Sequence, residues 1–328
     1  MFPAAGYIVI RNLFEGIGNT KASMWISFVG ILVNIPANYI FIYGKLGMPA
    51  LGGAGCGIAT SLVFLAMFIA MLVYGWYSRT TRPYRHWPKQ LSANLKDIWY
   101  VVCLGTPIAF SIFFEVTLFA CIPLAIVHLG PIVVAGHQVA NNYSALVFML
   151  PLSFGLATTI RVGHLVGQQN NKELKKAIMT ALCMAVFMSF FIASFTYFMR
   201  TYVASLYSTN PEVIAMASSL LILACFYQLS DAIQVVSACA LRGMKITKPV
   251  FYITLFAYWP IGFGLGAVLG LTDWLVAPMG AHGFWIGIII GLSTAAIMLA
   301  IILRNQLKRI DHEIRHAGID ADGGAVSP

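Results

Sequence analysis

The chain has 328 residues, of which 59% are hydrophobic and only 9% are charged, and its mean hydropathy is +0.83. Soluble domains carry about 25% charged residues, so this composition excludes a soluble globular protein and indicates a polytopic membrane protein. The formal net charge of +9 does not indicate nucleic-acid binding, because the basic residues are confined to alternate connections between apolar segments.

Nine apolar segments follow one another along the chain, and all but the first are long enough to cross a bilayer. They cover residues 3–17, 22–43, 54–77, 101–129, 132–160, 177–199, 212–241, 249–270 and 281–303. Of the 20 Lys and Arg residues, 18 fall on one side of the predicted membrane, and only Lys45 and Arg200 fall on the other. The positive-inside rule makes the crowded side cytoplasmic, and the C-terminus lies on that side.

Short matching strings indicate an internal duplication of the kind found in transporters. FEGIGNTK at 14–21 and LRGMKITK at 241–248 each join two apolar segments, at an offset of 227 residues. Pro36 matches Pro260, and Gly55 matches Gly283, at offsets of 224 and 228. The second copy has six segments but only three precede it, so we expect roughly 125 residues of the first copy to be absent from this chain.

This pattern predicts an all-α, polytopic membrane protein with four regions. Residues 1–77 form a remnant of an N-terminal lobe with three membrane helices, the first incomplete, and residues 78–97 form a basic cytoplasmic linker. Residues 98–309 form a complete C-terminal lobe of six helices, and residues 310–328 form a small, polar cytoplasmic tail that we expect to be disordered.

The second apolar segment carries two amides, Asn34 and Asn38, which share a helix face across a predicted kink at Pro36. Two interpretations are open. The amides line a polar path through the lobe, or they hydrogen-bond a neighbouring helix, as membrane asparagines often do.

Glu115 lies near the middle of the fourth segment, and no Lys or Arg occurs within that segment. An uncompensated acid at this depth costs several kcal/mol, so it needs a partner or a function. Without a fixed counter-charge, the carboxyl group is expected to hold a proton or to bind a metal cation. The alternative is a structural acid near the kinks at Pro107 or Pro123.

The fifth segment turns a polar face to one side. His137, Asn141 and Ser144 follow i, i+4, i+7 spacing, and Gln138 with Asn142 forms a neighbouring stripe. We interpret these residues as cavity-lining. For His137, a proton relay and a hydrogen-bonded packing residue are both open.

The seventh segment holds the second intramembrane acid, Asp231. Tyr227, Asp231 and Gln234 share one helix face at i, i+4 and i+7. A phenol, a carboxylate and an amide together supply oxygen ligands to a hard cation, or take up and release a proton. The alternative is a polar seam that fixes helix register.

Several strings in order resemble the multidrug and toxic compound extrusion (MATE) family, in its NorM-type branch. They are FEGIGNTK, FFEVTLFA, AGHQVANNYSALVF, YQLSDAIQ, LRGMKITK and LTDWLVAPMGAHGFW, within a match from about Pro3 to Lys308. The resemblance implies a twelve-helix antiporter with two six-helix lobes around a central cavity.

By the same resemblance, the protein exports cationic or amphipathic small molecules in exchange for Na+ or H+. Glu115 matches the family's acid in its seventh helix, and Asp231 with Tyr227 matches its cation site in the tenth. Asn34 and Asn38 match the polar cluster of the N-terminal lobe, whereas the family's acid in its first helix has no counterpart here.

We therefore predict a cation-coupled exporter in a bacterial inner membrane, not an enzyme, with Na+ or H+ as coupling ion and no other cofactor. A possible Na+ site at Glu115, Asp231 and Tyr227 follows from the same residues. We expect a monomer, or a chain that needs the missing N-terminal helices. The alternatives are a truncated fragment without activity, a flippase for a lipid-linked precursor, and an intramembrane enzyme, for which the catalytic motifs are missing.

Overall fold

The computed structural model describes residues 2–45, 49–78, 94–274 and 276–323, and describes side chains as far as Ile310. Every regular element within these ranges is helical, and eight helices are long and apolar enough to cross a membrane. The predicted all-α, polytopic class is confirmed. The chain divides into two compact units, Met1–Ala93 and Asn94–Pro328.

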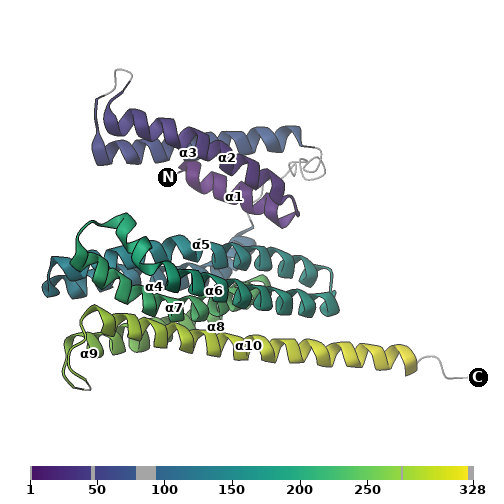
Figure 1. The fold of residues 1–328 in the computed structure, drawn as a ribbon. Coiled ribbons are helices and arrows are strands. Elements are labelled where there is room, and N and C mark those ends of the chain that lie inside the picture. The colour runs from purple at the N-terminus through teal and green to yellow at the C-terminus, as the bar shows by residue number, and fades with distance from the viewer. Residues whose placement is uncertain (1, 46–48, 79–93, 275, 324–328) are drawn as a thin grey trace, which may run out of the picture. The chain divides into compact units, whose positions relative to one another are not determined.

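The first unit contains three helices, α1 (Phe2–Gly16), α2 (Thr20–Tyr43) and α3 (Gly52–Tyr77), which lie side by side (Figure 1). A small core holds them together, formed by Tyr7, Phe14, Ala22, Ile26 and Met71. The helix α1 has only 15 residues, fewer than the roughly 20 that cross a bilayer.

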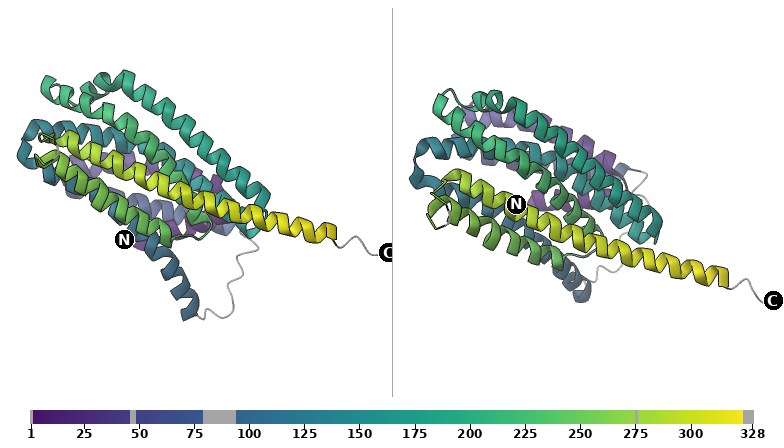
Figure 2. Two further views of the ribbon diagram at one scale, coloured as in Figure 1. Left: turned by 90° about the horizontal axis from the view of Figure 1, so that it is seen from below. Right: turned by 60° about the horizontal axis from the view of Figure 1, so that its bottom comes forward.

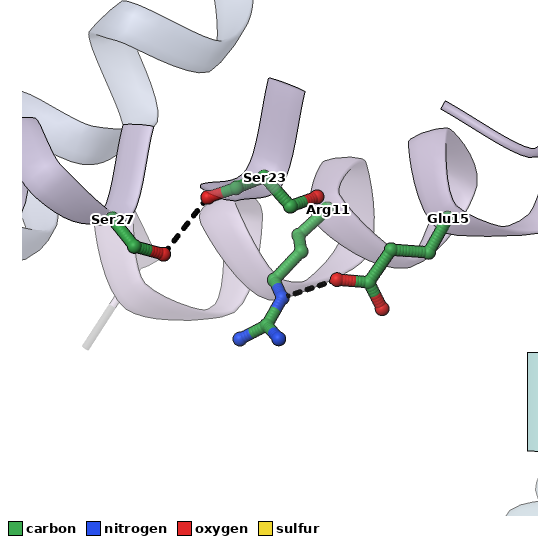
Figure 3. A network of polar contacts seen from close by, with 4 residues as sticks. All are labelled: Arg11, Glu15, Ser23 and Ser27. Atoms are coloured by element: carbon green, nitrogen blue, oxygen red, sulfur yellow. Dashed lines mark hydrogen bonds and ion pairs between the residues drawn. The ribbon is translucent and has the colours of Figure 1, made fainter. Parts of the chain in front are cut away.

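One basic residue lies within α1 itself. The Arg11 Nε donates a hydrogen bond to the Glu15 carboxylate one turn later, at 2.6 Å, and in α2 the Ser27 hydroxyl donates to the Ser23 carbonyl at 2.8 Å (Figure 3). The short ion pair compensates the charge of Arg11 locally, so the helix carries both charges without a partner from elsewhere.

The second unit is a bundle built around α7. It contains α4 (Leu95–Ile126), the 3₁₀ turn η2 (Val127–Leu129), α5 (Pro131–Gly167), α6 (Asn171–Tyr207), α7 (Pro211–Gly243), α8 (Lys248–Phe256), η3 (Ala257–Gly264), α9 (Leu265–Leu271) and α10 (Ala281–Gly323). The helix α7 packs on α5, α6 and α10 and buries residues around most of its circumference. Residues carried by α7 are therefore held from three sides.

The kink expected at Pro260 takes the form of a π-helical segment, η3, between α8 and α9. Proline has no N–H to donate and its ring clashes with the preceding turn, so a local widening of the helix accommodates it. The three elements together form one apolar span, Lys248–Leu271.

The turns after α1 and α7 have the same geometry, as the predicted duplication requires. In each, a residue in the left-handed region, Gly18 with φ +83° or Lys245 with φ +62°, donates to the carbonyl three residues earlier. The next residue donates to the carbonyl five residues earlier. These bonds define a Schellman motif, and the two motifs lie 227 residues apart.

The matching glycines also occupy equivalent positions. A Cβ on Gly55 would overlap the backbone of Phe41 at the end of α2, and a Cβ on Gly283 would overlap the backbone of Gly270 in α9. Each glycine thus lets a helix approach the one before it across a short connection.

The C-terminal region differs from the expectation. The helix α10 continues to Gly323, whereas residues 310–323 were predicted to belong to a disordered tail. Residues 304–323 include three Arg and one each of Gln, Leu, Lys and Glu, and they contain no Pro. This composition is compatible with a helix once a long apolar helix has nucleated it. Figure 2 shows α10 extending past the other helices of its unit.

The predicted linker is described only in part. Residues 79–93 lie outside the described ranges, and α4 begins at Leu95, inside the predicted linker, where the Asn94 side chain caps the helix by accepting from the Lys96 N–H at 3.1 Å. An N-cap amide satisfies a donor that would otherwise be free.

A further residue whose backbone lies in the left-handed region provides a test of stability. Gln169, in the turn between α5 and α6, is exposed and has φ +54°, where a Cβ is unfavourable. We expect Gln169→Gly to raise the free energy of unfolding by about 0.5–1 kcal/mol, measured by denaturation in detergent. Gln168→Gly, at φ −82°, is the control and should lower it. A loss of stability in both variants would contradict the assignment.

Candidate functional site

A cavity of about 470 Å³ lies in the second unit, between α4, α5 and α7. Its wall is mostly apolar, with a few polar groups that converge from three helices, which is the usual construction of a small-molecule site. The lining residues are Ile112, Glu115, Val116, Phe119, Asn141, Ser144, Ala145, Phe148, Leu152, Leu156, Tyr227, Gln234, Val235, Ala238, Cys239 and Arg242.

Glu115 faces this cavity because of its position on α4. Ile112, Glu115 and Phe119 lie at i, i+3 and i+7 and so share one helix face. Glu115 as a residue is half-buried, and its carboxylate has no hydrogen-bond or ion-pair partner among the residues that the structure describes. Its oxygens are therefore available to a ligand in the cavity.

The three predicted residues of α7 lie together but do not all face the same space. Tyr227 and Gln234 line the large cavity with Glu115. Asp231, only 2% exposed, lines a neighbouring space of about 10 Å³, whose wall also includes Tyr227 and Ser144. That volume suits a single small ligand such as one water molecule.

The two acids are close enough to interact. The Glu115 carboxylate lies within electrostatic range of Asp231 and of Tyr227. Asp231 has no hydrogen-bond partner in the described part of the chain, and the Gln234 Oε1 is also buried without one. Two acids near each other in an apolar bundle cannot both stay charged without a cation or a proton between them.

Aromatic rings fix the position of Tyr227. Its ring makes edge contacts with Phe119 and Trp285, each with centroids 6.2 Å apart. On the far side of Trp285, the indole Nε1 donates to the His137 Nδ1 at 3.2 Å. Edge-to-face pairs and a buried hydrogen bond hold each ring in one orientation, so the phenol is positioned before any ligand arrives.

A hydrogen-bonded chain lies behind the small space next to Asp231. The Tyr143 hydroxyl and the Thr196 hydroxyl are 2.8 Å apart, and the Gln228 Nε2 donates to Thr196 at 3.3 Å. Gln228 itself lines the small space. The chain joins α5, α6 and α7 and fixes the wall that Asp231 faces.

The polar face predicted on α5 contributes only part of its residues to the cavity. Asn141 lines it, as does Ser144. Gln138 and Asn142 are exposed and pair with each other, with the Gln138 Nε2 donating to the Asn142 Oδ1 at 3.3 Å. Neither they nor His137 are part of the cavity wall.

His137 has the environment of a packing residue. It is 1% exposed, its Nδ1 accepts from Trp285, and its Nε2 is buried without a partner. A relay needs a second group that exchanges protons with it, and none of the described residues is in hydrogen-bond contact with that nitrogen.

We expect His137→Leu to leave cationic dye binding by the purified chain within about two-fold. It should lower the free energy of unfolding by about 1–3 kcal/mol, because the Trp285 indole N–H loses its acceptor. Fluorescence titration and denaturation measure the two quantities. A large loss of binding in a stable protein would favour the relay instead.

The amides of the first unit pair with each other. The Asn38 Nδ2 donates to the Asn34 Oδ1 at 3.1 Å, and both side chains are half-buried on α2. The Asn38 Oδ1 is buried without a partner. The pair satisfies part of its own polarity, and its assignment to a polar path stays a prediction.

Arg242 is a residue of the cavity wall that the sequence pattern does not predict. It lies one position beyond the apolar segment 212–241, but α7 continues to Gly243, and helix side chains lean back over the preceding turn. Arg242 therefore lines the cavity and interacts electrostatically with Glu115, which corrects the expectation that no base neighbours this acid. Its spacing of 15 residues from Tyr227, close to four turns, was the available signal.

No group of three or more His, Cys, Asp or Glu residues that could hold a metal ion occurs among the described residues. The arrangement instead offers two carboxylates, a phenol and amides around the large cavity and the small space beside it. Such oxygen groups accept a hard monovalent cation or protons, and the apolar wall accepts the hydrophobic part of a small molecule.

Fold and cavity together define a polytopic helical protein with the fold of MATE transporters. The eukaryotic MATE transporter AtDTX14 superposes with a TM-score of 0.82 at 21% identity, covering 95% of this chain and 70% of that one. A Vibrio cholerae MATE transporter, a VcmN mutant, gives 0.79 at 16% identity, covering 92% and 66%.

The sequence comparisons are more specific. The MatE family model matches residues 107–268. The "Multidrug resistance protein NorM" of Photobacterium profundum is 49% identical over 304 residues, which are 90% of this chain and 65% of that protein. In sequence and in fold the chain is therefore similar to the MATE family and to its NorM type. It spans just under two thirds of the length of this NorM relative.

Proposed function

We propose that the protein takes part in the export of cationic or amphipathic small molecules, in exchange for Na+ or H+. The observation that carries this proposal is the carboxylate of Glu115, which faces a cavity of about 470 Å³ without a hydrogen-bond or ion-pair partner among the described residues. Tyr227 lines the same cavity, and Asp231, in the neighbouring small space, lies within electrostatic range of Glu115. The relative's name, with the words multidrug resistance, supports the substrate class.

The coupling follows from charge balance. A Na+ or H+ bound at Glu115 and Asp231 removes the repulsion between the two acids and so favours the arrangement of helices that keeps them close. A cationic substrate attracted to the same carboxylates competes with that ion. Entry of one therefore promotes departure of the other, which is the requirement for exchange.

The setting is a membrane that the chain crosses several times, as the eight apolar helices require. We place it in a bacterial inner membrane with the C-terminus in the cytoplasm, because 18 of the 20 Lys and Arg residues fall on one predicted side. The substrates are the small molecules named above, and the lipid bilayer is the remaining partner.

Transport by proteoliposomes tests the proposal and identifies the ion. The 328-residue chain is reconstituted with ethidium inside, and a Na+ gradient or a pH gradient is imposed separately. We expect one gradient to accelerate ethidium movement and the other to have a smaller effect. If neither gradient does so with correctly inserted protein, the proposal fails.

A further inference from the structure

Arg242 is a basic group whose position in the cavity has no explanation in the export proposal. It lies at the end of α7, and its guanidinium group is the one positive charge among the residues that line the cavity. The Arg242 Nε is buried without a hydrogen-bond partner. A guanidinium donor left unpaired away from water is costly, so this group needs an acceptor in some state of the protein.

Glu115 is the acceptor that the geometry offers. It lines the same cavity from α4, lacks a partner of its own among the described residues, and interacts electrostatically with Arg242 across the space. Asp231 is also within electrostatic range of Glu115, but it faces the smaller space and does not line the cavity that Arg242 enters. Arg242 and Glu115 are thus opposite charges that line one cavity without being in ion-pair contact with each other.

We propose that Arg242 is a tethered counter-cation for Glu115, which balances the carboxylate while the cavity is empty and opposes any cation that enters. This inference rests on the proposed function, since it concerns the same carboxylate. A fixed positive charge nearby weakens the attraction of Glu115 for every cation, whatever the shape of that cation.

Weaker binding of a cation at Glu115 is useful in a transport protein. A site that is traversed must bind its ion strongly enough to be occupied and weakly enough to release it. A lone carboxylate in an apolar bundle would hold a cation too tightly for rapid release, because few other groups solvate the charge there. The arginine takes the place of the departing cation, so that the acid is never left without a counter-charge.

Ethidium binding to the purified 328-residue chain tests this role by fluorescence titration. The expected result for Arg242→Gln is a Kd lower by a factor of about ten, because removing the opposing charge strengthens the pull of Glu115. Arg242→Lys keeps the charge and should stay within about three-fold of the original chain. A purely structural role for Arg242 gives the opposite sign, since a distorted cavity binds ethidium less well.

Two further variants isolate the cause. Lys245→Gln removes a positive charge three residues later, where the ammonium lies 5.8 Å from the Tyr100 ring centroid and outside the cavity wall, and it should leave the Kd unchanged. Combining Arg242→Gln with Glu115→Gln should abolish the tightening, because the arginine acts through the acid.

Failure of this inference and failure of the export proposal give different results. If Glu115→Gln weakens ethidium binding but Arg242→Gln does not tighten it, the counter-cation role is wrong and the export site stands. Arg242→Gln can also be compared in two backgrounds, with Glu115 intact and with Glu115→Gln. If it lowers the Kd for ethidium by the same factor in both, the arginine repels ethidium directly and the role through Glu115 is wrong. If Glu115→Gln leaves binding unchanged, both assignments are wrong.

Discussion

Glu115→Gln and Asp231→Asn are each expected to reduce gradient-driven ethidium transport to the level of protein-free liposomes. Each substitution keeps the size of the side chain and one acceptor oxygen but replaces the ionisable group, which holds a proton or a cation, with a neutral amide. Without that group, the imposed gradient no longer favours one helix arrangement over the other. Transport is followed by fluorescence, and insertion is checked by protease accessibility of the reconstituted protein.

Asp273→Asn is the matched control, since Asp273 is exposed in the connection between α9 and α10 and lies outside the cavity wall. It should transport at the original rate. The site assignment is wrong if both Glu115→Gln and Asp231→Asn also transport at the original rate. If only one of them is inactive, the coupling ion binds at that acid alone, and the neighbouring acid contributes packing.

The two acids show how far the sequence predicts the site. Glu115 and Asp231 were recognised because a carboxylate is costly in an apolar helix, and the faces of α4 and α7 that bear them follow from helical periodicity alone. Tyr227 and Gln234 were found in the same way. These inferences need only one helix at a time, so no knowledge of packing was required.

Side-chain contacts between different helices cannot be predicted from the periodicity of one helix. His137 follows the spacing of Asn141 on α5, yet its ring is buried against Trp285 of α10, 148 residues later. The end of the apolar run at residue 241 predicts that Arg242 lies in a cytoplasmic connection, although α7 continues to Gly243. In both cases the partner comes from another helix, and single-helix periodicity contains no information about that partner.

Gly287→Ala is expected to destabilise the second unit. Gly283, Gly287 and Gly291 recur every four residues on α10 and face η3 and α9, where an added Cβ at Gly287 would overlap the backbone of Gly262 and Gly266. Small residues at this spacing allow helix backbones to approach closely in membranes. Because backbone atoms cannot move aside, one methyl group should lower the free energy of unfolding by about 1–3 kcal/mol.

Gly105→Ala is the matched control on α4, where an added Cβ meets nothing within 4 Å. In a helix interior this change should be neutral or should stabilise by up to about 1 kcal/mol. Denaturation of both variants in the same detergent measures the difference. Equal effects of the two substitutions would show that α10 does not depend on the glycine contact.

The methyl group added by Gly287→Ala should also affect the functional site, because it pushes α10 and its Trp285 away from η3. This residue lies between Gly283 and Gly287 on α10, contacts the Tyr227 ring and donates to His137. A shift of α10 away from η3 therefore moves the ring that holds Tyr227 in place. We expect Gly287→Ala, at temperatures where it remains folded, to weaken ethidium binding several-fold, whereas Gly105→Ala leaves it unchanged. Unchanged binding in a destabilised Gly287→Ala protein would show that Tyr227 is positioned by Phe119 and its own helix alone.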